Sequence, residues 1–85
     1  MEDYNPRLRA AILSVVDEQL RKKDPPETRE TLDRLIGEGF SKADAKVLIG
    51  QVLAVELYCI SKEKKPFNRE RFVKNLKNLP AQPQE

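Results

Sequence analysis

The sequence has no histidine and no tryptophan, and its 85 residues include only one cysteine and three glycines. Without histidine, one chain supplies neither a Ser-His or Cys-His nucleophile pair nor the Cys/His ligand set of a typical zinc site. The lone Cys59 excludes a disulfide within the chain and is typical of a reducing compartment. We therefore expect a non-catalytic cytoplasmic protein with no metal and no other cofactor.

Long hydrophobic runs are also missing. The longest largely apolar stretch, residues 47–60, is interrupted by Gln51 and Glu56, whereas a membrane-spanning helix needs about 20 apolar residues. The polar start, MEDYNPRLRA, does not resemble a signal peptide. A chain of this length buries only about 60–65% of its unfolded surface, so we expect one small core without a deep substrate cavity and no membrane association.

The start and stop signals predict four helices and no strand. Asn5 and Pro6 open the first helix, which ends near residues 21–23. Asp24 is expected to cap the second helix, and Gly39 to end it with Phe40 folded back onto the helix. On the first helix, one broad apolar face is expected to point inward, and it comprises Leu8, Ile12, Val15, Val16 and Leu20.

The third predicted helix, residues 42–62, follows the cap Ser41 and is apolar nearly all round, so it must be covered on most sides. Asn68 caps the fourth helix, Phe67 packs on Phe72, and Pro80 stops it. The sequence thus predicts an all-α fold, a compact four-helix domain of residues 1–79 with a long central third helix. Residues 80–85 are expected to form a disordered C-terminal tail.

Two features of the third helix are candidate contacts. Glu56 lies among apolar residues, and it is either a buried acid that binds a cation or partner or, as we expect, part of an exposed stripe near a base such as Arg9. A line of small or short side chains predicts a close helix contact, either with the first helix, which we favour, or between two copies of the chain. This line comprises Ala43, Val47, Gly50 and Ala54.

The third helix has more apolar surface than three short helices are expected to cover, and leftover apolar surface in a small protein predicts a partner site. The predicted interface residues are Val52, Val55 and Leu57. A homodimer is the simplest form of such an assembly, and an unidentified protein partner is the other. The sequence therefore favours a protein-protein interaction or assembly module.

Charge is distributed unevenly and suggests an alternative. Residues 1–60 hold nine basic and eleven acidic side chains, whereas residues 61–79 hold seven basic and two acidic ones. A basic C-terminal helix could bind the phosphates of a nucleic acid, in a salt-sensitive manner, or simply form a solvated surface. The candidate phosphate contacts are Lys65, Arg71, Lys74 and Lys77.

Several short motifs spread along the chain, among them N-P-R-L at residues 5–8, D-P-P-E-T-R at 24–29 and K-P-F-N at 65–68, resemble a bacterial family of small all-helical domains of unknown function. The resemblance implies an all-helical fold. It also implies histidines on the first and third helices, which look like metal ligands, but this chain has none and carries Arg9, Leu13, Ala43 and Val47 at the corresponding positions. No metal-dependent activity is therefore carried over.

Overall fold

All four predicted helices are present in the computed structural model, which describes residues 6–83. Helix α1 spans Pro6–Lys22, α2 spans Pro26–Gly37, α3 spans Lys42–Glu63 and α4 spans Arg69–Asn78. No strand occurs in the described part of the chain. The all-α, four-helix prediction is confirmed, while the expected cap Asn5 lies outside the described residues.

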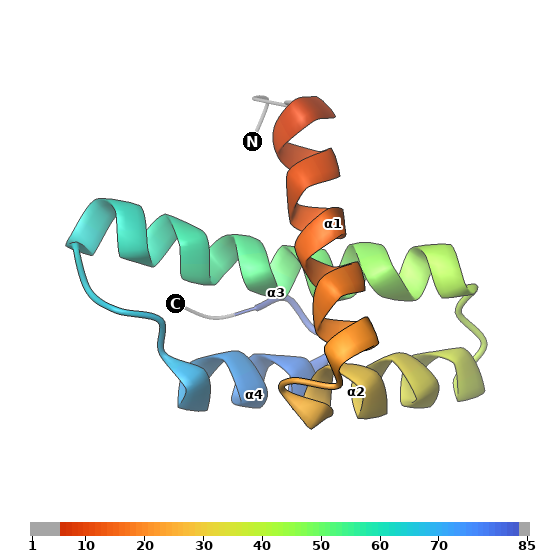
Figure 1. Ribbon diagram of the computed structural model, residues 1–85. Helices are drawn as coiled ribbons and strands as arrows, with labels where there is room; N and C mark the ends of the chain where they lie inside the picture. Colours follow the sequence, from red (N-terminus) through yellow and green to blue (C-terminus); the bar gives the residue numbers. More distant parts are fainter. Residues whose placement is uncertain (1–5, 84–85) are drawn as a thin grey trace.

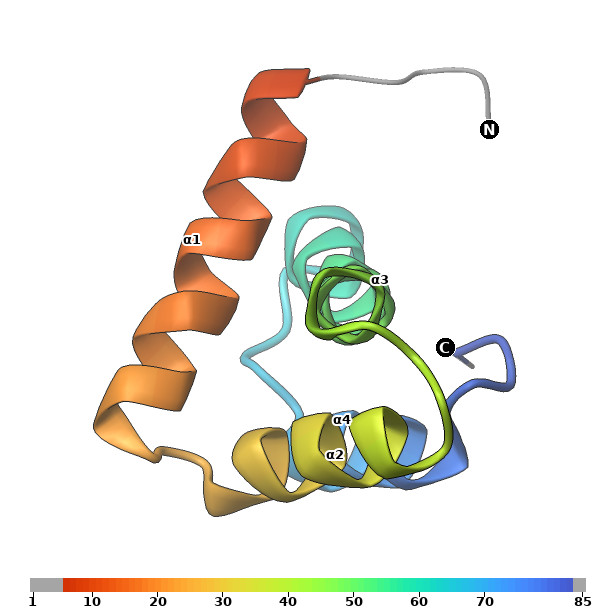
Figure 2. The ribbon, with the colours of Figure 1, turned by 90° about the vertical axis from the view of Figure 1, so that its right-hand side faces the viewer.

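Helix α3 is the longest helix and packs against each of the other three, as α2 also does, whereas α1 and α4 do not contact each other. Helices α2 and α4 form a layer on one side of α3, and α1 crosses α3 steeply on another side (Figures 1 and 2). The largest fully buried apolar side chains, Phe72, Leu35 and Ile49, come from α4, α2 and α3, so the core lies between α3 and the α2–α4 layer. Val16 and Leu20 bring the C-terminal half of α1 into the same core.

The caps predicted for α3 and α4 are formed. The side-chain oxygen of Ser41 accepts a hydrogen bond from the Asp44 amide at 3.0 Å, and that of Asn68 accepts one from the Arg71 amide at 2.9 Å. The rings of Phe67 and Phe72 lie 5.2 Å apart, as expected for a hydrophobic contact across the start of α4. Each cap typically contributes about 1 kcal/mol, so local sequence fixes where these helices begin.

The start of α2 differs from the prediction. Asp24 does not cap this helix, because the position before its first residue is occupied by Pro25 in an extended conformation, and no side chain there accepts a hydrogen bond. Proline has no polar side-chain atom, so the helix begins one residue later than an Asp24 cap would require. The other end follows the prediction, since Gly39 has a φ of 107° and the Phe40 amide donates to the Leu35 carbonyl at 3.1 Å.

The C-terminal end of α4 is tied to α2 and to the residues that follow it. A guanidinium nitrogen of Arg34 donates to the Leu76 carbonyl at 3.0 Å, and the Ala81 amide donates to the Asn78 carbonyl at 2.9 Å. The segment predicted to be a disordered tail therefore begins with a hydrogen-bonded turn. Its last two residues, 84 and 85, lie outside the described part of the chain. No helix among the described residues is long and apolar enough to cross a membrane.

Candidate interaction surfaces

Gly50 marks the point where α1 crosses α3. It is buried, and a β-carbon added to it would lie 3.2 Å from Cγ2 of Ile12 and 3.6 Å from Cδ2 of Leu13. The missing side chain thus lets the two helices approach closely, and the structure places this contact within one chain rather than between two copies. The close approach offsets the cost of a helical glycine, about 1 kcal/mol relative to alanine.

The other members of the small-residue line lie at increasing distance from this crossing. Val47 and Ala54, one turn either side of Gly50, are half-buried. Ala43 is exposed, which corrects its assignment to the close contact. It lies on the same stripe of α3, two turns before Gly50, but α1 crosses steeply and so contacts only a short length of that stripe (Figure 1).

Part of the apolar face predicted to point inward on α1 is exposed instead. Leu8 is 54% and Val15 43% exposed, whereas Val16 is fully buried. Adjacent residues on a helix point about 100° apart, so when Val16 and Ile12 face α3, Val15 and Leu8 face sideways. Helix α1 therefore carries two apolar stripes, one that packs on α3 and one that faces solvent.

The ion pair between Asp17 and Lys46 shows which way the solvent-facing stripe points. Oδ1 of Asp17 lies 2.6 Å from Nζ of Lys46, which belongs to the N-terminal half of α3. Val15 is two residues from Asp17 and hence about 200° round the helix, on the opposite side of α1. The second stripe of α1 therefore faces the side on which the C-terminal half of α3 extends (Figure 1).

That half of α3 also exposes apolar side chains. Leu57 follows Gly50 by seven residues, so it lies on the side of α3 that α1 crosses, and it is 41% exposed; its neighbour Tyr58 is 48% exposed. The two helices together form an angle lined by apolar groups, which we name the α1–α3 corner. It is made up of Leu8, Ala11 and Val15 of α1 and Ala54, Leu57 and Tyr58 of α3.

The predicted interface residues separate into different environments. Val52 is fully buried in the core cluster with side chains of α2 and α4, which corrects its assignment to a partner interface. It lies about 200° round α3 from Gly50, away from the crossing. Val55 is half-buried, and Leu57 is exposed in the α1–α3 corner.

Glu56 is fully buried, so the expectation of an exposed stripe near Arg9 is wrong. Its Oε2 accepts a hydrogen bond from Nε of Arg71 at 2.7 Å, and its Oε1 accepts from a terminal guanidinium nitrogen of Arg71 at 3.1 Å and from the Asn68 amide at 3.2 Å. A signal for this burial exists in the sequence, because Glu56 follows the buried Ile49 and Val52 by seven and four residues.

The partner of Glu56, Arg71, was a predicted phosphate contact, and the structure corrects this assignment. Its guanidinium is already bound to the carboxylate, and these hydrogen bonds raise the pKa of Arg71 against the opposing effect of partial burial. Both oxygens of Glu56 have partners, so this ion pair is a closed contact that fixes the start of α4 against α3. Two nitrogens of the Arg71 guanidinium and both Glu56 oxygens are thus engaged within the chain.

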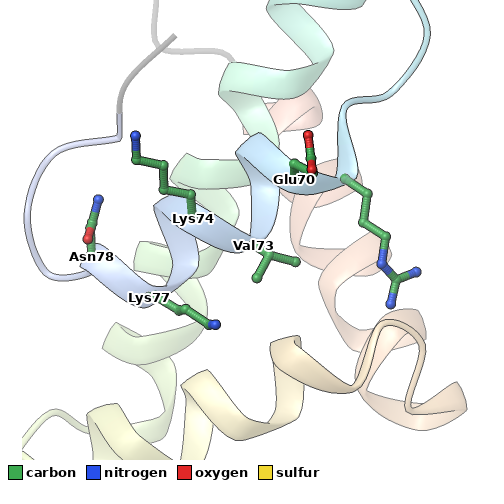
Figure 3. Close-up of a pocket in the computed structure, with 6 residues that line it drawn as sticks. Glu70, Val73, Lys74, Lys77 and Asn78 are labelled. Carbon is green, nitrogen blue, oxygen red and sulfur yellow. The ribbon is translucent and has the colours of Figure 1, made fainter.

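The outer face of α4 carries the remaining basic side chains (Figure 3). A shallow hollow of about 520 Å³ is lined by Arg69, Glu70, Val73, Lys74, Lys77 and Asn78. Arg69 is paired with Glu27 at 3.5 Å. Lys74 and Lys77 point to different sides of α4 (Figure 3), and neither forms an ion pair within residues 6–83. These two lysines, and Lys65 in the exposed α3–α4 loop, do not converge on one anion site.

The remaining groups with metal-binding or nucleophilic chemistry are Cys59 and the acidic side chains. Cys59 is a free, buried thiol on α3, facing the core rather than solvent. Among the described residues, no three acidic or cysteine side chains lie close enough together to hold a metal ion. The surfaces that remain as candidates for binding are the α1–α3 corner and the lysines of α4.

Comparison of the chain with protein-family models, with curated proteins and with solved structures gives no match. The resemblance to a bacterial family of helical domains therefore stays a prediction that rests on its short motifs.

Proposed function

We propose that this chain is a non-catalytic, cytoplasmic interaction or assembly module that binds a protein through the α1–α3 corner. One observation carries the proposal: four large apolar side chains, each 41–54% exposed, gather on two helices at one side of their crossing. They are Leu8, Val15, Leu57 and Tyr58. Single exposed apolar residues are common on proteins, but a contiguous group on a small domain is typical of a partner site.

The two apolar stripes of α1 support the same conclusion. Helix α1 docks through another stripe: Ile12 and Leu13 contact α3 at Gly50, and Val16 and Leu20 lie in the core. Leu8 and Val15 contribute little burial to the monomer. A second stripe that the fold does not use, next to exposed Leu57, is what a binding surface for a protein partner or for a second copy of the chain requires.

Photo-crosslinking in cells of the source organism tests this function. A benzoylphenylalanine residue replaces Leu57 in one variant and Ile36 in the matched control. Ile36 is equally exposed, at 42%, but lines a hollow beside Asp17 and Lys46, on the opposite side of α1 from the corner. We expect a discrete covalent protein adduct at the Leu57 position and none at the Ile36 position, because only the corner binds a partner.

Adducts in equal yield at both positions would show random encounter and would contradict the proposal. The proposal would also be contradicted if the Leu57 position gave no adduct and sedimentation velocity showed only monomeric protein. If the adduct has twice the mass of the chain, the module is a homodimer, and replacing Leu8 with lysine should convert the sedimenting species to a monomer.

A nucleic-acid-binding accessory protein remains the alternative, supported by the exposed and unpaired Lys74 and Lys77. For this function we expect a fluorescent RNA or DNA tracer to co-sediment with the protein at low salt and to dissociate at moderate salt, because phosphate contacts release counterions. The double variant Lys74→Glu, Lys77→Glu should then lose the tracer. A tracer that never co-sediments would exclude this alternative.

A further inference from the structure

The charges that surround the α1–α3 corner are mostly positive. The first half of α1 carries Arg7 and Arg9 and no acid before Asp17. The end of α3 and the loop after it, residues 61–65, add three lysines and one glutamate, and all of these side chains are exposed. Residues 6–15 and 61–65 together therefore hold five cations and one anion, and Glu18, the next acid along this side of α1, is paired with Arg21 and Lys22.

The length of the corner suits a single helix. Helix α1 crosses α3 steeply, so the exposed sides of the two helices meet at an angle (Figures 1 and 2). The small Ala54 lies one turn after the crossing at Gly50, and the larger Leu57 and Tyr58 follow it along α3. Amphipathic helices bind such surfaces through apolar residues spaced i, i+3, i+4 and i+7. The six residues of the corner fall well short of the roughly 20–30 residues per side of a standard globular interface.

A second copy of this chain fits the corner poorly. A two-fold dimer would bring the same five cations against their own counterparts, and like charges across an interface oppose association. A nucleic acid would use the cations and could stack on the Tyr58 ring, over which Lys62 already lies, but it would leave Leu8, Val15 and Leu57 without an apolar partner.

We propose that the α1–α3 corner binds an amphipathic helix of another protein whose apolar stripe is flanked by aspartate and glutamate. This inference rests on the proposed function and adds the chemical nature of the partner. The apolar stripe would cover Leu8, Val15 and Leu57, and the flanking acids would face Arg9 and Lys65 on the two rims. The cations would speed association and select the partner, and the apolar contacts would hold it.

Binding of two matched peptide pools to the full chain tests the inference by fluorescence anisotropy. Each peptide has about 18 residues, or five helical turns, with varied large apolar residues at i, i+3, i+4 and i+7. The exposed positions are glutamate in one pool and lysine in the other. We expect members of the glutamate pool to bind, less tightly as salt rises, and the lysine pool not to bind.

Variants locate the site. Leu57→Ser should weaken binding of the selected glutamate peptide about 5- to 30-fold, as for loss of a central apolar contact, whereas Ile36→Ser should leave it unchanged. Lys65→Glu should weaken it several-fold and flatten the salt dependence, whereas Lys42→Glu, at the other end of α3, should not. Circular dichroism of each variant checks that its helical content is retained.

The outcomes separate the two proposals. If the glutamate pool fails to bind, or the lysine pool binds equally well, the acidic-helix inference is overturned, and adducts from the Leu57 crosslinker would still support an interaction module. If RNA or anionic lipid vesicles bind through Leu57 and Lys65 while the glutamate pool does not, the partner class is wrong. If the peptides do not bind and Leu57 yields no adduct, the proposed function falls as well.

Discussion

Replacing Arg71 with alanine is expected to lower the free energy of unfolding by about 3–5 kcal/mol, because it leaves a buried charge without its main partner. Glu56 is fully buried, and two of its three hydrogen bonds come from the Arg71 guanidinium. The Asn68 amide alone would remain. Small domains have a total stability of about 5–15 kcal/mol, so urea denaturation followed by circular dichroism should show a variant close to unfolding.

The matched control removes both charges. The double variant Glu56→Met, Arg71→Met keeps much of the side-chain volume and leaves no uncompensated carboxylate, so it should be far more stable than Arg71→Ala. Its unfolding transition should lie near that of the unmodified chain. If Arg71→Ala loses less than about 1 kcal/mol, solvent screens the carboxylate, and the ion pair is weaker than its distances indicate.

Local signals in the sequence predict where the helices of this protein begin and end. Ser41 and Asn68 cap α3 and α4 as expected, because a capping side chain bonds to an amide only three residues away. Gly39 ends α2 for an equally local reason, the positive φ that the turn requires. The Asp24 cap failed where two local signals compete, since Pro25 takes the capping position itself.

Interactions between distant residues could not be predicted in the same way. The spacing of apolar residues indicates that Glu56 shares a stripe with Ile49, but nothing near it identifies Arg71, fifteen residues later, as its partner. That pairing depends on the path of the α3–α4 loop, which brings the start of α4 back beside α3. Arg71 is a candidate phosphate contact as long as only its own helix is considered, because its partner carboxylate belongs to the neighbouring helix.

The exposed apolar side chains lie partly outside the residues predicted for an interface. Excess apolar surface was assigned to α3 alone, through Val52, Val55 and Leu57, whereas half of the exposed group lies on α1. The apolar face of α1 is broad enough to cover two directions, and only the crossing at Gly50 decides which of them faces the core. The rotation of α3 about its own axis that buries Val52 also exposes Leu57.

Lysine substitutions on α3 test this division directly. Val52→Lys should lower the free energy of unfolding by several kcal/mol and leave the chain largely unfolded, because Val52 is 0% exposed and a charged amine there would have no buried partner. Leu57→Lys should change the same quantity by no more than about 0.5 kcal/mol, because Leu57 is 41% exposed and a lysine can extend into water. Thermal and urea denaturation of both variants provide the measurement.

The contrast between these two positions bears on function because the substitution is the same and only the environment differs. If both variants unfold, Leu57 is part of the core, and the α1–α3 corner loses its central apolar group. If both stay folded, Val52 is not buried, and the packing of α3 on the α2–α4 layer is different. Only an unfolded Val52→Lys beside a folded Leu57→Lys leaves an apolar surface that the monomer does not need and that a partner can cover.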